Sequence, residues 1–250
     1  GRIVGGSPAN IADYPSIVQI EVLEWYRWEQ WCGGSIINNF YILTAAHCFM
    51  HIDDFRIRAG SELRETGGDV YEVSSILNHP DFIYDYPSEP SLEADISLMR
   101  LRSSLVFSNA VQPIAILPSN FVVPDNAPVI YAGWGAVKVR ILIQQICAER
   151  YANAKYPLIP ANVTEKMICA GSSGYGACHG DSGGPLYFGG VLAGIISFGS
   201  SDCAHDGYPE VSIRVASYTD WIRVLSGPFI YNHKPLKVAS HIHGPVFCTV

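Results

Sequence analysis

Gly180-Asp181-Ser182-Gly183-Gly184-Pro185 is the stretch of this 250-residue chain that says most about its fold. Three glycines and a proline around one serine disfavour a helix or a packed strand and favour a tight turn. Because glycine has no Cβ, its backbone N–H groups can approach a ligand closely. A hydroxyl beside converging N–H donors provides the nucleophile and the charge stabilisation that acyl transfer requires. Alone, the hexapeptide is equally compatible with a structural turn.

The composition is that of a globular protein with a negative charge. The chain is 48% hydrophobic and 16% charged, with a formal net charge of −7. Since no run of Lys and Arg occurs, nucleic acid is not an expected partner. No apolar run approaches the ~20 residues of a membrane-spanning helix, so no membrane span is expected. The length fits one large all-β domain or two smaller ones.

Seven cysteines are scattered along the chain, at positions 32, 48, 147, 169, 178, 203 and 248. No Cys-x-x-Cys pair occurs, which argues against a zinc ribbon or a thioredoxin-type site. We expect no metal and no cofactor. Scattered cysteines are typical of disulfides formed in an oxidising compartment. Asn162 begins an Asn-Val-Thr glycosylation acceptor, a short motif that also arises by chance. Both features predict a secreted, extracellular protein.

Short β-rich runs separated by glycine and proline turns follow one another along most of the chain. The runs predicted as strands are Ser16–Val22, Phe40–Thr44, Phe55–Arg58 and Val191–Ser197. Helical periodicity is convincing once, in Ser217–Leu225. This pattern predicts all-β barrels or sandwiches with one late helix. Residues 228–250 show no clear period, and we expect an irregular tail that is ordered only if docked.

Two further motifs provide a base and an acid. Thr44-Ala45-Ala46-His47-Cys48 follows a strand, and its small residues let His47 pack tightly while one ring edge stays accessible. Asp95 stands at the start of an apolar run, where it can be buried and can hold an imidazole by its N–H. With Ser182, these residues complete a set of nucleophile, base and orienting acid.

These motifs occur in order with three more: Arg2-Ile3-Val4-Gly5-Gly6, Cys32-Gly33-Gly34-Ser35 and Gly133-Trp134-Gly135. From Arg2 to about Leu225 the chain resembles the chymotrypsin/trypsin serine peptidases, and in particular arthropod digestive trypsin-like and collagenolytic enzymes. The resemblance implies an all-β fold of two packed antiparallel six-stranded β-barrels with a C-terminal helix. It also implies three segments: a residual propeptide (1–2), a peptidase domain (3–227) and the tail (228–250).

The resemblance assigns roles to the motif residues. Ser182 attacks the scissile carbonyl, His47 transfers its proton to the leaving amine, and Asp95 orients His47. The N–H groups of Gly180 and Ser182 form the oxyanion hole. The family's disulfides are implied for Cys32–Cys48, Cys147–Cys169 and Cys178–Cys203. Cys248 is left over. It can be a free thiol, form a disulfide with another chain or belong to a docked tail.

The resemblance also implies activation by proteolysis. In the family, cleavage before the Ile-Val-Gly-Gly segment frees an α-ammonium, which pairs with the acid before the nucleophile, here Asp181, and moves Gly180 into place. Because Arg2 still precedes Ile3, we expect a precursor or a chain that retains two residues. Arg2 predicts an activating protease that cuts after basic residues. The segment 135–147 is shorter than usual, which puts full activation in doubt.

The specificity pocket departs from the trypsin pattern. Trypsins carry an aspartate at its base where this chain has Gly176, and a glycine where it has Glu210. The resemblance implies further pocket residues: Ala177, Ser197, Phe198 and Gly199. Ser197 is also expected to support the buried Asp95. The open Gly199 leaves the pocket mouth wide.

Three interpretations of Glu210 remain open. It points into the pocket and attracts Arg or Lys before the scissile bond (the P1 residue), with broadened tolerance. It fills the pocket and restricts P1 to small side chains, as in elastases. It turns away and leaves a neutral, chymotrypsin-like slot. An unpaired carboxylate in a dry pocket has a raised pKa, which would weaken a basic preference.

The sequence therefore predicts a secreted, monomeric serine endopeptidase that works through an acyl-enzyme. Its expected partners are protein or peptide substrates, an activating protease and protein inhibitors. A digestive role is implied by the resemblance alone. The alternatives are a non-catalytic serine-protease-like binding protein and a poorly active variant. All three catalytic residues are present, which disfavours the first alternative.

Overall fold

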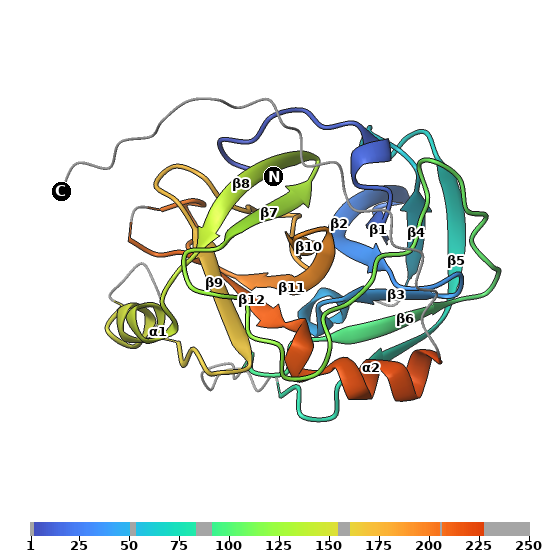
Figure 1. The fold of residues 1–250 in the computed structure, drawn as a ribbon. Helices are drawn as coiled ribbons and strands as arrows, with labels where there is room; N and C mark the ends of the chain where they lie inside the picture. The colour runs from blue at the N-terminus through green and yellow to red at the C-terminus, as the bar shows by residue number, and fades with distance from the viewer. Residues whose placement is uncertain (1–2, 51–53, 84–91, 155–160, 206, 228–250) are drawn as a thin grey trace.

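Two closed antiparallel β-barrels make up the body of the molecule (Figure 1). The computed structural model describes residues 3–50, 54–83, 92–154, 161–205 and 207–227. The first barrel has the strand order β1-β2-β3-β6-β5-β4 and the second the order β10-β11-β12-β9-β8-β7. The strands of the first are β1 Ile17–Glu24, β2 Arg27–Ile36, β3 Tyr41–Thr44, β4 Phe55–Ala59, β5 Asp69–Asn78 and β6 Ser97–Leu101. Those of the second are β7 Pro128–Gly133, β8 Gly135–Ile141, β9 Met167–Gly171, β10 Pro185–Phe188, β11 Val191–Phe198 and β12 Glu210–Arg214.

The predicted strands are confirmed. All four predicted runs coincide with β1, β3, β4 and β11, with ends that differ by at most two residues. Each barrel is filled by its inward-facing apolar side chains, which remove nonpolar area from water. Ile20, Ile57 and Leu98 are fully buried in the first barrel, and Ile168 and Leu186 are buried in the second.

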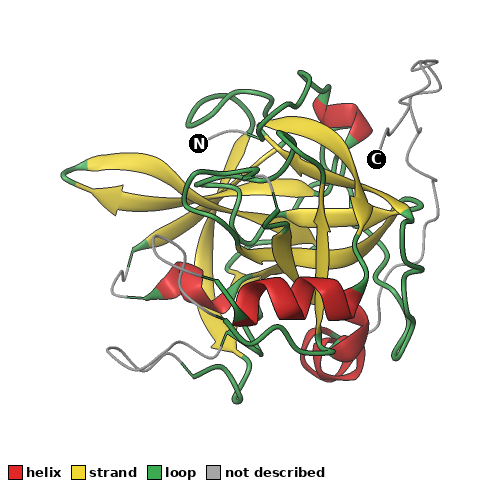
Figure 2. Ribbon diagram, turned by 90° about the vertical axis from the view of Figure 1, so that its left-hand side faces the viewer, coloured by secondary structure: helices red, strands yellow, loops and turns green. Residues whose placement is uncertain are grey.

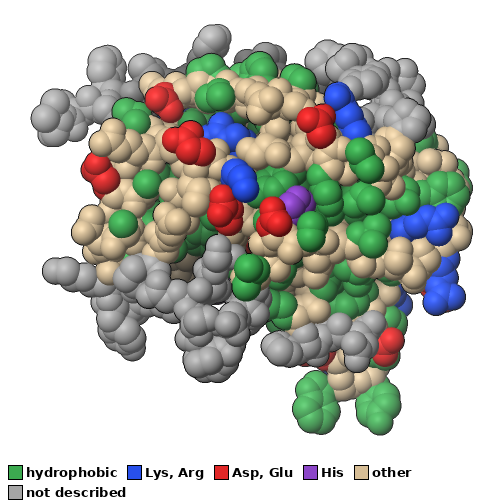
Figure 3. All heavy atoms as spheres, turned by 90° about the horizontal axis from the view of Figure 1, so that it is seen from below, with side chains coloured by type: hydrophobic (Ala, Val, Ile, Leu, Met, Phe, Trp, Pro, Cys, Tyr) green, Lys and Arg blue, Asp and Glu red, His purple; other side chains and the backbone are tan. Residues whose placement is uncertain are grey.

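The predicted late helix is α2, Thr219–Ser226, preceded by the 3₁₀ turn η3, Val215–Ser217. Its inward face carries Ile222, which is fully buried. His79, at the end of the first barrel, lies between Tyr218 and Trp221, with ring centroids 5.0 Å from each. Figure 3 shows the molecule from below, where hydrophobic side chains gather in the right-hand part of the face and most acidic side chains lie to the left. α2 therefore closes the bottom of the fold by apolar contact.

A second helix, α1 (Gln144–Ala152), corrects the prediction of a single helix. Figure 1 shows α1 end-on and α2 from the side, and Figure 2 shows the reverse. Only Cys147 and Tyr151 of α1 are buried, so the segment carries no apolar stripe that periodicity could detect. Tertiary bonds hold it instead: Cys147 is disulfide-bonded to Cys169, and the Tyr151 hydroxyl donates to Pro209 O at 2.7 Å.

Three disulfides brace the two barrels. Cys32–Cys48, Cys147–Cys169 and Cys178–Cys203 are paired as the resemblance implies, and close loops of 16, 22 and 25 residues. In the chain-entropy account, each such loop is worth ~3 kcal/mol.

None of the described helices is long and apolar enough to cross a membrane. Arg2, Cys248 and the tail 228–250 lie outside the described residues.

Candidate active site

The Ser182 turn belongs to the second barrel but is bonded to the first. The Gly33 N–H donates to Ser182 O at 2.7 Å, and the Thr44 hydroxyl donates to Gly33 O at 2.8 Å. Gly183 has φ +75°, and a Cβ there would overlap the Thr44 hydroxyl. Glycine at this position is therefore required both by the backbone and by the close approach of the barrels. This contact places the nucleophile turn against β2 and β3.

Strand pairing brings His47 and Asp95 together. Thr44 at the end of β3 pairs with Ser97 at the start of β6. His47 follows β3 by three residues and Asp95 precedes β6 by two, so the pairing brings them close. His47 Nδ1 lies 2.7 Å from Asp95 Oδ2, and the His47 backbone N–H donates to Asp95 Oδ1 at 2.8 Å. The Ser197 hydroxyl donates to Asp95 Oδ2 at 2.5 Å. The fully buried carboxylate thus receives hydrogen bonds from two residues.

The charges of this pair are mutually supporting. Burial opposes ionisation of Asp95, but the charge of His47 and the hydrogen bonds from His47 and Ser197 outweigh it and lower the pKa of Asp95. Burial also disfavours a charged imidazole, yet Asp95 raises the pKa of His47 above its usual value. The arrangement can therefore hold a proton on His47 next to a carboxylate that stays ionised.

The backbone around Ser182 is held open for a ligand. Gly180 has φ +88°, and the Gln30 side chain donates to Gly180 O at 3.2 Å. Among the described residues, the amide N–H groups of Gly180 and Ser182 have no hydrogen-bond partner. Nor does a hydrogen bond join Ser182 Oγ to His47 among these residues, which is common in unliganded sites. Sequence reasoning missed Gln30, because only the fold brings it to a residue 150 positions away.

The amino-terminal segment is inserted beside Asp181. Ile3 is buried, and a Cβ on Gly133 would contact both the Ile3 side chain and the Asp181 carboxylate. The Val4 N–H donates to Gly176 O at 2.9 Å, which ties the segment to the chain that leads to the Ser182 turn. Burial raises the pKa of Asp181 to about 6. The carboxylate therefore lies in an environment that favours a nearby positive charge.

The short segment 135–147 has a regular structure. Residues 135–141 form β8, which pairs directly with β7 around Trp134. The amino-terminal segment pairs with this strand through Ser7 and Ala136, which exchange both backbone hydrogen bonds at 3.0 and 3.1 Å. The shortened segment thus serves as a docking edge for the chain that leads to Ile3.

A cavity of about 300 Å³ opens beside Ser182. Ala177, Ser197, Phe198 and Gly199 line it, together with Glu210. Gly176 lies behind Glu210 and does not line this cavity among the described residues. Its size fits a single side chain next to the nucleophile.

Glu210 lies across this pocket. A Cβ on Gly176 would come within 3.3 Å of Glu210 Cγ, and a Cβ on Gly199 would overlap the carboxylate. The two glycines therefore make the room that the side chain occupies. Among the described residues, the carboxylate accepts one hydrogen bond, from the Ala204 N–H at 3.5 Å, and burial raises the pKa of Glu210 to about 8. The interpretation in which Glu210 turns away from the pocket does not describe this structure.

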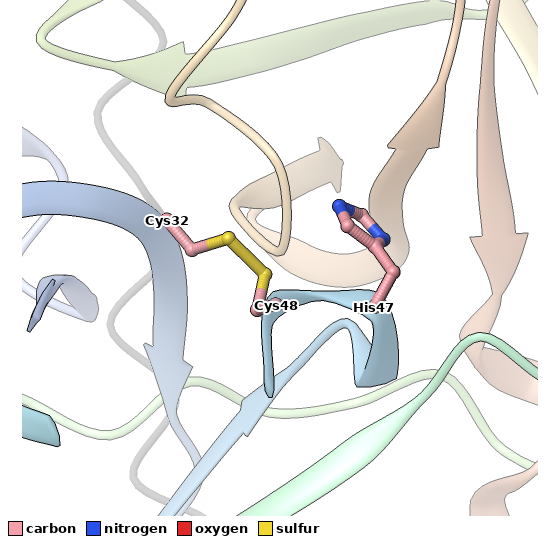
Figure 4. Close-up of side chains that lie close together, drawn as sticks. All are labelled: Cys32, His47 and Cys48. Atoms are coloured by element: carbon pink, nitrogen blue, oxygen red, sulfur yellow. A yellow bond between two sulfur atoms is a disulfide. The ribbon is translucent and has the colours of Figure 1, made fainter. Parts of the chain in front are cut away.

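One cluster of metal-ligating residue types lies near the site, formed by Cys32, His47 and Cys48 (Figure 4). Both sulfurs are bound in the Cys32–Cys48 disulfide, which lies beside the His47 imidazole. Disulfide sulfurs are not thiolates, so the cluster lacks the ligand chemistry of a zinc site.

Asn162, the predicted glycosylation acceptor, is exposed.

Comparison with known proteins agrees with this geometry. The family model described as Trypsin matches residues 3–222. The chain belongs to the trypsin family. Among curated relatives of this family member, "Trypsin, alkaline C" of Manduca sexta is 39% identical over 88% of this chain and 90% of its own length. "Trypsin delta" of Drosophila erecta is 36% identical over 89% of this chain and 87% of its own length. The "Vitellin-degrading protease" of Bombyx mori is 34% identical over 88% of this chain and 84% of its own length.

A solved relative has the same fold. The structure titled neuropsin, a serine protease expressed in the limbic system of mouse brain, superimposes with a TM-score of 0.74 at 28% identity. It covers 88% of this chain, and 98% of the neuropsin chain is covered in return. This chain is thus a trypsin-family serine endopeptidase, whose similarity to insect trypsins extends over most of its length.

Proposed function

We propose that this chain is a secreted endopeptidase that hydrolyses peptide bonds with Ser182 as nucleophile, His47 as general base and Asp95 as orienting acid. The observation that carries the proposal is the hydrogen-bonded chain from Ser197 through Asp95 to His47, next to the Ser182 turn. Secretion is supported by the three disulfides. Protein digestion is the physiological role we propose.

The residues divide the reaction into two steps. His47 Nε2 takes the proton of Ser182 Oγ as the hydroxyl attacks the carbonyl carbon, while Asp95 holds Nδ1–H. The N–H groups of Gly180 and Ser182 receive the oxyanion. His47 then protonates the leaving amine, which leaves an acyl group on Ser182. Water attacks this ester with His47 again as base, and the carboxylic acid product departs.

Activation is proposed to require cleavage between Arg2 and Ile3. The freed α-ammonium of Ile3 would lie beside Asp181, which is buried and has a pKa raised to about 6. A positive charge there would stabilise the carboxylate. Since Asp181 stands directly between Gly180 and Ser182 in the chain, this pairing would fix the two N–H groups that form the oxyanion hole. Docking of the segment on Gly176 and β8 supports this pathway.

For P1 we propose a preference for Arg and Lys with tolerance of other side chains. Glu210 is the one acidic side chain that lines the pocket among the described residues, and it has no cationic partner there. A P1 cation would supply the missing counterion and lower the pKa of Glu210. A second candidate is a preference for small P1 side chains. It is favoured by the position of Glu210, which spans the pocket between Gly176 and Gly199.

Two variants distinguish these candidates. Glu210→Gln keeps the size of the side chain but removes its charge, whereas Glu210→Gly removes both. If charge sets specificity, kcat/KM for P1 Arg relative to P1 Ala falls about 10–100-fold in Glu210→Gln. If size sets it, Glu210→Gln has no effect on this ratio, and Glu210→Gly admits large apolar P1 side chains. An unchanged peptide-library profile in both variants would contradict a role for Glu210.

Labelling tests the enzyme class itself. A fluorophosphonate probe should modify Ser182 after cleavage at Arg2–Ile3 and much more slowly before it. Mass spectrometry of the labelled peptide identifies the site. Absence of labelling after cleavage would indicate a non-catalytic relative, and equal labelling before and after would contradict the activation mechanism.

A further inference from the structure

Glu210 separates two cavities. Behind the specificity pocket lies a second cavity of about 260 Å³, formed by the end of β8, the residues after β9 and the segment that leads into β12. Among the described residues, Glu210 is the one that lines both cavities. Glu210 therefore lies between a front pocket at Ser182 and a second, rear cavity, with its carboxylate between Gly176 and Gly199.

The rear cavity is large enough to receive the carboxylate. Its volume of about 260 Å³ compares with ~30 Å³ for a water molecule in the liquid, and a carboxymethyl group is about the size of two or three waters. In the structure the carboxylate lies against Gly199 of the front pocket, and among the described residues it is held by one long hydrogen bond, at 3.5 Å, from the N–H of Ala204, which lines the rear cavity. Little would be lost if the side chain changed its rotamer.

The charges around the two cavities differ. Arg140, Arg150 and His205 line the rear cavity, where Glu210 is the one acidic residue among those described. Arg140 donates to Asn126 O at 2.7 Å and Arg150 to Gly207 O at 2.9 Å, which hold both guanidinium groups near the cavity. The front pocket is lined by one histidine, His179, and by no arginine or lysine among the described residues. An ionised carboxylate is consequently better stabilised at the rear.

We propose that Glu210 has two positions: forward across the pocket when P1 is small or absent, and retracted into the rear cavity when P1 is Arg or Lys. In the retracted position the carboxylate lies between the P1 cation and the rear arginines, and the front pocket becomes deep enough for a long side chain. The same residue thereby admits small and basic P1 residues. This inference rests on the proposed role of Glu210 in P1 specificity.

The direct test is a crystal structure of the activated enzyme with Ser182 bonded to a peptidyl phosphonate that carries Arg at P1. A matched complex with Ala at P1 is the control. We expect the Glu210 carboxylate in the rear cavity with Arg and across the pocket with Ala. A forward carboxylate in both complexes would overturn the two-position proposal, while its contact with the guanidinium would leave the basic preference intact.

A steric variant tests the same idea in solution. Ser172→Phe places a large side chain in the rear cavity, which Ser172 lines. The control, Val122→Phe, enlarges a residue of a separate cavity that Glu210 does not line. We expect Ser172→Phe to lower kcat/KM for P1 Arg at least tenfold and to leave P1 Ala within twofold, with Val122→Phe changing neither. An unchanged Arg-to-Ala ratio in Ser172→Phe would count against retraction. Loss of both activities is resolved by the crystal structures.

Discussion

Two buried carboxylates, Asp95 and Glu210, lie near the nucleophile turn, and their surroundings are opposite. Asp95 accepts hydrogen bonds from the ring and backbone of His47 and from Ser197, and its pKa is lowered. Glu210 accepts one bond of 3.5 Å, and burial raises its pKa to about 8. The same chemical group is thus fixed and ionised at one site, and weakly held at the other.

The difference shows how donors decide what a buried acid can do. A carboxylate with several donors cannot move without leaving them unpaired, so Asp95 suits an orienting role. Burial with one weak donor raises the pKa of Glu210 to about 8, so this carboxyl group is mostly protonated near pH 7 and can change its partner. Glu210 therefore suits a pocket that must respond to its ligand.

Replacement of the fixed acid should have the largest effect. Asp95→Asn removes the charge that stabilises the imidazolium and favours the wrong His47 tautomer, so kcat should fall by about 10⁴-fold. Steady-state hydrolysis of a P1 Arg peptide amide measures this loss. Asp220→Asn, an exposed acid on α2, is the control and should keep full activity. A loss of less than tenfold in Asp95→Asn would contradict the orienting role.

Loss of the activation partner should come next. Asp181→Asn removes the proposed counterion of the Ile3 α-ammonium, so the Gly180 donor is no longer fixed. The expected loss in kcat is about 10²–10³-fold, the usual effect of one missing oxyanion donor. Asp202→Asn, an exposed acid on the following loop, is the matched control. Full activity of Asp181→Asn after cleavage would show that Asp181 has another role.

The pH dependence of P1 preference should expose the weakly held acid. Glu210 has a pKa of about 8, above the ordinary 4.5, so it ionises in the free enzyme only as the pH rises through about 8. The ratio of kcat/KM for P1 Arg to that for P1 Ala should then rise about tenfold from pH 6 to pH 9. Use of the ratio cancels the titration of His47. Glu210→Gln should give a flat ratio, and a flat ratio in the wild type would contradict the raised pKa.

The same titration affects stability. A carboxyl group whose folded pKa is raised contributes stability that is complete below its unfolded pKa of about 4.5 and is lost as the pH rises through about 8. Wild-type enzyme should therefore lose more of its free energy of unfolding between pH 5 and pH 9 than Glu210→Gln does. Urea denaturation at both pH values measures the difference, and parallel pH profiles for the two proteins would refute it.

The smallest effect is expected at Ser197. Ser197→Ala removes one donor from Asp95 but leaves the two bonds from His47, so kcat/KM should fall about threefold to tenfold. The acid limb of the pH–rate profile should also shift, because Asp95 then has fewer donors. Ser35→Ala is the control, since the Ser35 hydroxyl is buried without a partner among the described residues. An unshifted profile would leave Ser197 with a packing role alone.

Local patterns were sufficient to predict much of this molecule. The glycine-rich turn at Ser182, the strand before His47 and the apolar run after Asp95 are local features, and the fold brings them together as expected. α1 was missed, because a disulfide and the buried Tyr151 hold it rather than an apolar stripe. The direction of Glu210 could not be read from sequence either. It depends on Gly176 and Gly199, which are adjacent to it only in the folded chain.

The most direct test is the pKa of the Glu210 carboxyl group, measured by ¹³C NMR of glutamate-labelled enzyme and assigned by comparison with Glu210→Gln. We expect a pKa of about 8 in the free enzyme. Saturation with benzamidine, as a cation in the specificity pocket, should lower that pKa below about 6. A pKa near 4.5 in the free enzyme that benzamidine does not change would show that Glu210 is neither perturbed by burial nor in contact with a cation in the pocket.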